Sequence, residues 1–502
     1  MTPRSGWALA LIVAVGLALR LYGVHNPILD HPGWRQGDEA AIARNFYELR
    51  NNIMFPQTDY NGPPPNYVEL ELQIVPYAAA QAYHALGGVH EIVARLLVIA
   101  FSLGTVLLLW LLGRELYSPR AGLIAAALFA VSPGAVYYGR AIIPESDMLF
   151  FSVAALLFWW RFVRARRRAD WLWATVFAAL AFLAKPPAVV ILAPIFATGL
   201  VAPPPDDIPA APPRLRLDWA PFGLGVLSLV PLWLYLSHLH AIAEWHWATG
   251  ITGLHVLPAL WGRLLHPSDF AAGIAGMFAQ LRMLATTILG PAIFGLVLLA
   301  TIAQPRGVEA ARRNLFFGAW IAMLGAYAFV VVNVERVDYY LMPFVPWAVL
   351  YAAGALDHVL ELIWPPRPAA TTIAAAAIAT LFAVYAGMLG VHPYYTWSRG
   401  VYAAADEVRM TIDPGALIVM GHYDPSVLYT IGHRGWEEDP LVWSVADMQS
   451  AMRKGARYYI AVEVPRLRAN RPLYSFLQRF ARVPVRSGWQ VYDLRRPLVS
   501  GN

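Results

Sequence analysis

The chain is dominated by apolar runs that approach the length of a membrane-spanning helix, separated by polar segments of unequal length. A spanning helix needs about 20 mostly apolar residues. We predict spans at residues 6–23, 92–112, 121–138, 148–163, 171–184, 187–202, 219–237, 283–303, 315–333, 341–356 and 372–391. The pattern predicts a polytopic α-helical membrane protein with about 11 transmembrane helices.

The distribution of arginine sets the direction of these spans. Arginines concentrate in alternate connections, above all in residues 164–168 (RARRR), and cytoplasmic loops carry such an excess. The N-terminus is then cytoplasmic and the C-terminus lies outside. The long segments 24–91, 238–282 and 392–502 all lie outside, which suggests chemistry on that face. Residues 203–216 (PPPDDIPAAPPRLR) form a Pro-rich cytoplasmic linker.

The first apolar run admits a second interpretation. Arg4 precedes it, as in a signal peptide. No clean small-residue cleavage site follows, and the segment continues through residues 20–22 (RLY), so we favour an uncleaved anchor.

Composition supports the membrane interpretation and excludes several classes. Of 502 residues, 58% are hydrophobic and only 14% are charged, whereas a soluble domain has about 25% charged residues. This excludes a disordered chain, a fibrous repeat and an ordinary cytosolic enzyme. The absence of cysteine excludes disulfides, thiolate nucleophiles and Cys-based metal sites. The net charge of +6 fits cytoplasmic loops and anionic lipid headgroups rather than nucleic acid.

The last part of the chain changes character, because charges become frequent and short strand-like runs alternate with helical patterns. Strands are predicted at 416–420, 457–463 and 489–493, and helices at 401–410 and 474–480. We therefore predict a transmembrane module over residues 1–394 and a small periplasmic α/β domain over residues 395–502.

The first outer loop groups Trp34, Arg35, Asp38 and Glu39. A helical pattern begins at Asp38, which would place this carboxylate at the start of a helix. Aspartate is a preferred N-cap and suits the positive end of a helix. Capping and catalysis are therefore equally good interpretations of Asp38, although capping alone would require none of its three neighbours.

Glu69 and Glu71 lie later in the same loop, just before the apolar stretch 72–86. That stretch is too short to span and predicts an interfacial helix. Either glutamate could simply be solvated. This is less plausible for Glu71, because a carboxylate at the membrane boundary is costly without a partner.

Charges and tyrosines also mark the outer ends of later spans. Arg140 and Glu145 lie between the third and fourth spans and could form a purely structural ion pair. Lys185 is one of only two lysines in the chain; it either extends its charge to the interface or binds an anion, and we favour the anion. Tyr339 and Tyr340 open the tenth span.

Together these residues supply carboxylates, cations and aromatic rings on one face of the membrane. A carboxylate can act as a general base toward a hydroxyl, and guanidinium or ammonium groups hold phosphate. The set fits the transfer of a sugar from a lipid-linked phosphate to a hydroxyl at the outer surface.

Residues 34–47 (WRQGDEAAIARNFY) resemble the first-loop motif of bacterial GT-C membrane glycosyltransferases, relatives of the protein O-mannosyltransferases and of the aminoarabinose transferases that modify lipid A. The similarity continues in order along nearly the whole chain, at residues 71, 76–77, 89–95, 139–140, 144–145, 185–186, 338–343 and 429–436. The resemblance implies a GT-C fold with interfacial helices in the first outer loop. It also implies a place in the bacterial cytoplasmic (inner) membrane.

The resemblance also implies roles. It assigns the family's first acidic motif to Asp38, as the base, with Glu39, and further family positions to Glu71, Arg140 and Glu145. The chemistry of five further side chains also suits binding of the substrate and the donor phosphate. These residues are Trp34, Arg35, Lys185, Tyr339 and Tyr340. The implied reaction is an inverting single displacement from a polyprenyl-phosphate sugar to a hydroxyl of a glycan, lipid or protein.

No cofactor is expected to be required. His31, His84 and His90 have no metal-ligand spacing, and the relatives suggest that metal is dispensable, although a divalent cation could bind. The expected partners are the sugar donor, the hydroxyl acceptor and membrane lipids, with no nucleic acid.

Two other functions compete with the transferase. A lipid or glycan transporter (a flippase) would need charges that line a path through the spans, whereas here they cluster at the outer ends. A non-catalytic receptor would use the C-terminal domain for binding alone.

Overall fold

The computed structural model describes residues 3–202, 214–215, 218–305, 308–363, 384–385 and 387–498. Most of the predicted linker 203–216 and of the predicted span 372–391 lies outside these residues. The chain divides into two compact units. The helical unit comprises Met1–Val24, Arg95–His238 and Trp247–Pro393, and the mixed unit comprises His25–Ala94, Leu239–His246 and Tyr394–Asn502.

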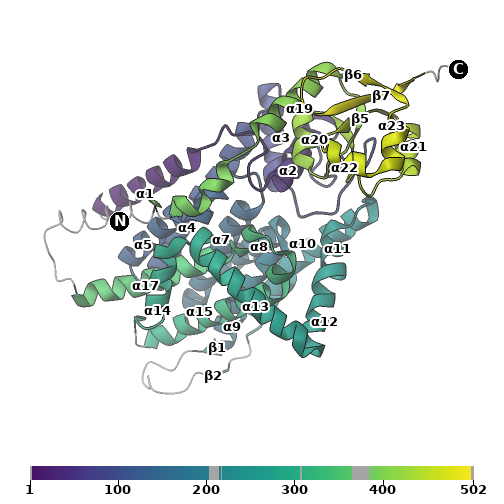
Figure 1. Cartoon of the computed structure of the whole chain (residues 1–502). Helices are drawn as coiled ribbons and strands as arrows, with labels where there is room; N and C mark the ends of the chain where they lie inside the picture. The colour runs from purple at the N-terminus through teal and green to yellow at the C-terminus, as the bar shows by residue number, and fades with distance from the viewer. Residues whose placement is uncertain are drawn as a thin grey trace. The chain divides into compact units, whose positions relative to one another are not determined.

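The helical unit consists of α-helices with short 3₁₀ and π segments, labelled in part in Figure 1. Its first half contains α1 (Pro3–Leu21), α4 (Glu91–Leu116), α5 (Pro119–Val131), α6 (Pro133–Tyr137), α7 (Glu145–Ala165), α8 (Arg168–Ala184), η1 (Pro186–Ile191), α9 (Leu192–Leu200) and the strand pair β1 (Val201–Ala202) and β2 (Arg214–Leu215). Its second half contains α10 (Ala220–Ile242), α11 (Trp247–Gly250), η2 (Ile251–Val256), α12 (Leu257–Leu265), α13 (Pro267–Met283), η3 (Leu284–Ile288), α14 (Gly290–Ala300), α15 (Val308–Tyr327), η4 (Ala328–Val332), α16 (Asn333–Glu335), η5 (Asp338–Leu341) and α17 (Phe344–Ile363).

Among the described residues, six helices are long and apolar enough to cross a membrane: Glu91–Leu116, Glu145–Ala165, Ala220–Ile242, Pro267–Ile288, Ala310–Glu335 and Asp338–Leu362. Four shorter apolar helices are Gly6–Leu21, Pro119–Val131, Pro186–Leu200 and Gly290–Ala300. The prediction of a multi-pass helical membrane protein is confirmed, and the count of eleven spans stays a prediction.

One predicted segment differs in its internal structure. We placed 238–282 outside the membrane and began a span at 283, but this boundary falls inside the apolar helix Pro267–Ile288. Asp269 and Arg282 sit near the two ends of that helix and lower its hydropathy, which hid it from the sequence pattern. Gly290 then adopts a φ of 76°, a left-handed conformation that favours glycine, and a separate helix starts there.

Hydrogen bonds from one buried arginine connect three helices of the helical unit. The fully buried guanidinium of Arg20 donates to the Ser102 hydroxyl at 2.8 Å and to the carbonyls of Gly16 and Ala130 at 3.0 Å. These bonds tie α1 to α4 and α5, because a buried charge is costly without such partners.

The mixed unit contains a five-stranded sheet with helices on both faces (Figure 1). Its strands are β3 (Leu417–Met420), β4 (Arg434–Glu437), β5 (Ala456–Ala461), β6 (Phe480–Val483) and β7 (Gln490–Pro497), in the spatial order β4-β3-β5-β7-β6. Its helices are α2 (Gly33–Glu48), α3 (Ile74–Leu86), η6 (His392–Tyr395), α19 (Arg399–Thr411), α20 (Pro425–Ile431), α21 (Val445–Arg453), α22 (Val464–Ala469) and α23 (Arg471–Leu477). Strand β3 runs parallel to β4 and β5, whereas β7 is antiparallel to β5 and β6.

The predicted α/β fold of the C-terminal part is confirmed. The three predicted strands are β3, β5 and β7, and the two predicted helices are α19 and α23. Strands β4 and β6 were not predicted, since each has only four residues and the alternation in β4 is broken by a glycine. Successive residues of β3 serve opposite cores: Ile418 and Met420 pack with α19 and α20, and Val419 packs with α21 to α23.

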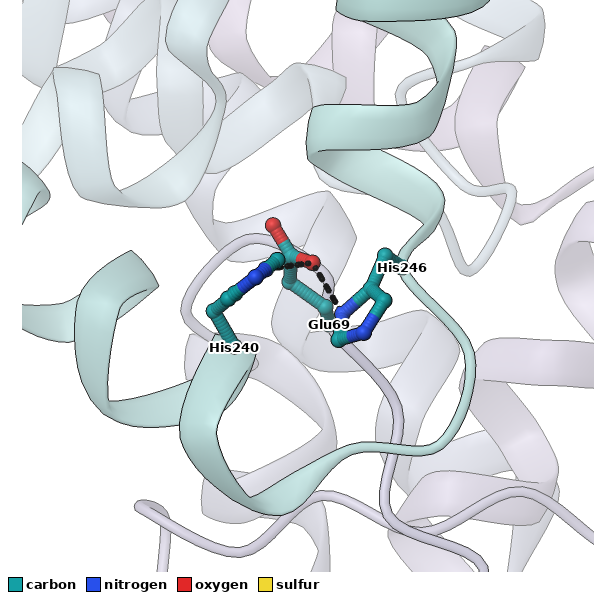
Figure 2. A group of neighbouring side chains, drawn as sticks. All are labelled: Glu69, His240 and His246. Carbon is teal, nitrogen blue, oxygen red and sulfur yellow. Dashed lines mark hydrogen bonds and ion pairs between the residues drawn. The ribbon is translucent and has the colours of Figure 1, made fainter.

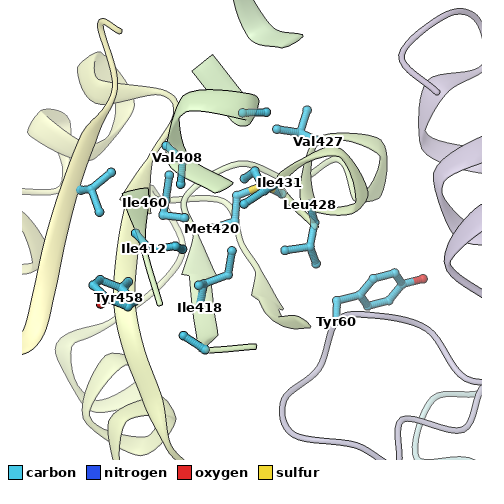
Figure 3. Packing of buried hydrophobic residues seen from close by; sticks show 13 residues of the cluster. Tyr60, Val408, Ile412, Ile418, Met420, Val427, Leu428, Ile431, Tyr458 and Ile460 are labelled. Carbon is cyan, nitrogen blue, oxygen red and sulfur yellow. The ribbon is translucent and has the colours of Figure 1, made fainter. Parts of the chain in front are cut away.

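The first outer loop contributes directly to the core beside α19 and α20. Tyr60 packs with Val427 and Leu428 in that apolar cluster, and its hydroxyl points away from the cluster (Figure 3). The predicted helix 72–86 is present as α3, and its interfacial position stays a prediction. Helix α2 packs against both α3 and α20.

The contact between α2 and α20 requires a glycine at position 37. A Cβ atom added to Gly37 would lie 2.5 Å from the backbone nitrogen of Ser426 and 2.6 Å from its Cα. Backbone atoms cannot move aside as a flexible side chain can, so the helices would have to separate.

We therefore predict that Gly37→Ala lowers the free energy of unfolding by about 1–3 kcal/mol, the usual effect of overpacking. Thermal unfolding of the purified full chain measures this. Gly400→Ala is the matched control, because its added Cβ would meet only the Ser398 hydroxyl at 3.9 Å. Equal melting temperatures for the two variants would contradict the prediction.

Candidate functional site

The structure excludes the capping interpretation of Asp38. Helix α2 begins at Gly33, and its N-cap Pro32 makes no side-chain capping bond. Asp38 therefore lies inside the helix, where only 6% of its surface is exposed. The predicted helix start at Asp38 is wrong. Pro32 and Gly33 do not separate the helix from the first span, because proline is well tolerated just before a helix.

Asp38 lies in an acidic environment that favours its protonated form. Its pKa is raised from 3.8 to about 7, mainly by burial and also by Asp424 and Asp59, against the opposing effects of Arg35 and of a hydrogen bond from Tyr60. Within the part of the chain that the structure describes, Asp38 Oδ1 accepts no hydrogen bond. A carboxyl group poised near neutral pH with a free acceptor atom has the properties of a general base.

Arg35 balances two of the predicted acidic residues. Its Nη2 lies 2.8 Å from Glu39 Oε1, and the same nitrogen forms an ion pair with Glu71. Both glutamates are buried, so Glu71 has the partner that its position demanded. Trp34 precedes Arg35 on α2 and is 44% exposed.

A polar network that the sequence did not reveal fixes α2 to the first loop and to β4. Arg434 donates to the Asn45 side-chain oxygen at 2.7 and 2.9 Å and reaches Glu48 at 2.5 Å. Asn45 donates in turn to Asp59 at 3.1 Å, and Arg44 forms an ion pair with Asp59. The network crosses more than 370 residues of sequence, which explains why no local pattern predicted it.

A second group of predicted residues lies in the helical unit. The buried Lys185 forms an ion pair with the buried Glu145, and its ammonium lies 4.8 Å from the ring centroids of both Tyr339 and Tyr340. The side chain therefore does not extend to the interface. The ammonium is held by a carboxylate and two aromatic faces, a geometry that can also receive a phosphate.

Arg140 belongs to the same unit and is fully buried. Its Nη1 donates to the Gly23 carbonyl at 3.0 Å, and its guanidinium lies 4.8 Å from the ring centroid of Tyr137. Glu145 forms an ion pair with Lys185, and the structural pair between Arg140 and Glu145 stays a prediction.

A third group contains residues that could hold a metal ion. Glu69 is fully buried, and its Oε2 lies 3.2 Å from His240 Nδ1 and 2.9 Å from His246 Nδ1 (Figure 2). The three ligand atoms lie within 4.8 Å of one another. One carboxylate and two imidazoles are donors that zinc accepts, with water in the remaining position. The solvated interpretation of Glu69 was therefore wrong.

The histidines of this group were missed because they lie some 170 residues from Glu69 in the sequence. The only local signal is the pair His238 and His240 at the end of α10, followed by His246. Backbone pairing brings the segments together: Val68 pairs with Trp245, and the Glu69 nitrogen donates to the Trp245 carbonyl at 3.3 Å.

Comparison with known proteins agrees with this architecture. Residues 74–234 match a family model described as dolichyl-phosphate-mannose-protein mannosyltransferase. ArnT from Cupriavidus metallidurans in the apo state matches with a TM-score of 0.60 and 16% identity, covering 98% of each chain. The same protein bound to undecaprenyl phosphate matches with a TM-score of 0.58 and 14% identity, covering 97% of this chain and 98% of that one.

A third structure is the oligosaccharyltransferase AglB from Archaeoglobus fulgidus in complex with an inhibitory peptide and a dolichol-phosphate. It matches with a TM-score of 0.53 and 13% identity, covering 98% of this chain and 74% of that chain. A search of curated proteins finds no match. The chain thus has the fold of the GT-C membrane glycosyltransferases, as the resemblance implied.

We predict that the group formed by Glu69, His240 and His246 binds one zinc ion. Metal analysis of the purified full chain should find about one equivalent, which Glu69→Gln or His246→Asn removes. His255→Asn is the matched control, since His255 pairs with Glu335 at 3.0 Å outside any three-residue group found among the described residues. Metal-free wild-type protein after zinc incubation would contradict the prediction.

Proposed function

We propose that this chain is a membrane glycosyltransferase that moves a sugar from a polyprenyl-phosphate donor to a hydroxyl acceptor. The family match and the fold support a glycosyltransferase. The observation that carries the proposal is Asp38, a buried carboxyl with a pKa of about 7 and a free acceptor oxygen. A structural carboxylate would be ionised and fully paired, whereas a base must be able to accept a proton.

In the proposed mechanism, the acceptor hydroxyl donates its hydrogen to Asp38 while its oxygen attacks the anomeric carbon. The bond between that carbon and the phosphate oxygen breaks, and the lipid phosphate leaves with the electron pair. The displacement occurs once, so the anomeric configuration inverts. Positive charge develops on the sugar at this stage, where the surrounding carboxylates stabilise it.

In the helical unit, the donor phosphate is proposed to meet Arg140 and Lys185, with Tyr339 and Tyr340 as contacts for the sugar. In the mixed unit, Trp34 and Arg35 are proposed as further substrate-binding residues. Support comes from ArnT, whose structure contains undecaprenyl phosphate, and from AglB, whose structure contains a dolichol-phosphate. Each of the three cations has internal partners in this structure, so a phosphate would share or displace them. We propose that the acceptor carries its hydroxyl on a glycan, a lipid or a protein.

The multi-pass membrane location follows from the fold and the apolar helices. We propose the cytoplasmic (inner) membrane of a bacterium, with the N-terminus inside and the mixed unit on the periplasmic face, because arginine dominates the opposite connections.

Asp38→Asn should abolish transfer, with a loss of about 100- to 10,000-fold, the usual contribution of a general base. Mass spectrometry of lipid-linked sugars and surface glycans in a deletion strain measures this: the wild-type gene restores the product and the variant does not. Asp406→Asn, which changes a half-exposed acid that pairs with Arg409, should restore it fully. Restoration by Asp38→Asn would remove Asp38 as the base.

The same variant should be stable, which separates lost chemistry from lost folding. Burial raises the pKa of Asp38 above its unfolded value of 3.8. The stability that protonated Asp38 contributes is therefore lost as the pH rises from 3.8 through about 7, and the loss is complete above that value. Asn cannot ionise, so the variant should melt at a higher temperature than wild type above pH 7.

The anion role of Lys185 needs a paired substitution. Lys185→Met alone should destabilise by about 3–5 kcal/mol, because it leaves the buried Glu145 without its cation. The double variant Lys185→Met/Glu145→Gln removes both charges and should fold. We predict that the double variant binds undecaprenyl phosphate at least tenfold more weakly than wild type; equal affinity would make the ion pair structural.

A further inference from the structure

The C-terminal strand β4 ends in a carboxyl group that lies beside the Asp38 site. Glu437 is the last residue of β4 and only 7% of its surface is exposed. Its Oε2 has no hydrogen-bond partner, and the carboxyl group forms no ion pair, among the residues that the structure describes. A buried carboxylate without a cation is costly, so this group requires an explanation.

Backbone hydrogen bonds hold β4 against the first outer loop. The Gly62 nitrogen donates to the Gly435 carbonyl at 2.7 Å, and the Gly435 nitrogen donates to the Asp59 carbonyl at 2.8 Å. Gly435 has a φ of 149°, and a Cβ there would lie 1.9 Å from the Ile418 carbonyl oxygen. Only glycine allows this close approach of β4 to Ile418. Glu437 lies two residues after Gly435, the residue that is bonded to the first outer loop.

The groups that interact with Glu437 come from every element packed there: Asp38 of α2, Asp59 and Tyr60 of the first loop, Tyr423 and Asp424 before α20, and Glu438 after the strand. Arg35 of α2 interacts with Asp38 and Tyr60. The charges that act most strongly on Glu437 itself are all negative, and Asp38 is the strongest of them. The Arg35 cation is shared by Glu39 and Glu71. Two neighbouring carboxyl groups without a cation of their own do not both ionise readily.

We propose that Glu437 is a second carboxyl of the Asp38 site and a positioning residue that keeps its proton while Asp38 ionises. Because its carboxyl group is neutral, a single negative charge remains on Asp38 to accept the acceptor's proton. The C-terminal part thereby contributes to the site rather than only covering it. The effect on transfer rests on the proposed function, whereas the protonation itself does not.

The direction of both pKa shifts agrees with this assignment. Burial, then the charge of Asp38, raises the pKa of Glu437 well above 4.5. We assign the retained proton to Glu437 because its Oε2 has no hydrogen-bond partner among the described residues, whereas Asp38 accepts a hydrogen bond from Tyr60.

Infrared difference spectroscopy of the purified full chain tests the proposal without substrate, because protonated carboxyl groups absorb apart from carboxylates. Glu438 also has a pKa of about 7 and would overlap with Asp38. We therefore use the Glu438→Gln variant as the background. In this background, the carboxyl band that titrates near pH 7 reports Asp38, and a band that persists at higher pH reports Glu437.

Glu437→Gln should remove the persistent band and leave the midpoint near pH 7 unchanged. Asp38→Asn should remove the band near pH 7 and lower the Glu437 midpoint, because one neighbouring negative charge is lost. A persistent band that survives Glu437→Gln, or a Glu437 midpoint insensitive to Asp38→Asn, would overturn the proposal. In transfer assays, Glu437→Gln should lose the decline in kcat at alkaline pH that ionisation of Glu437 causes in the wild type. A failure of transfer in the wild type would count against the proposed function only.

Discussion

The site depends on one side chain that joins two distant parts of the sequence. The ring of Tyr60 lies in the apolar core of the C-terminal sheet, and its hydroxyl bonds to Asp38 on α2. Together with the backbone bonds of Gly435 to Asp59 and Gly62, this residue fixes the first outer loop to the C-terminal fold. The close contact of Gly37 with Ser426 completes the enclosure from the side of α2.

The burial of Asp38 lowers the stability of the folded state, but it gives the carboxyl group the proton affinity that a base needs. Burial is the main reason why the pKa of Asp38 is raised to about 7. The ionised form of Asp38, which must act as the base, is therefore also the form that destabilises the folded state. The polar network around Arg434 and Asn45 offsets this penalty by anchoring α2. Active sites commonly combine a strained group with a rigid surrounding structure.

The sequence predicted the features that depend on local composition. Apolar runs revealed most helices, alternation revealed three strands, and charges at outer helix ends led to Asp38, Glu71 and Lys185. The sequence did not predict the features that depend on contacts between residues far apart in the chain. Nothing local distinguishes Glu437, whose burial depends on β4 meeting the first loop. Nothing local links Glu69 to His240 at the end of α10 and His246 after it. The start of α2 was misplaced because local breakers were weighed above the packing of the helix against α20.

The most direct test of the account is the pH dependence of transfer by the wild-type full chain, with the lipid-linked sugar that accumulates in the deletion strain as donor. If Asp38 is the base, kcat/KM should rise with pH through a single ionisation near pH 7, since the free enzyme must lose that proton before it can accept another. An ionisation near pH 4, the ordinary value for aspartate, or a rate that does not depend on pH would contradict the account.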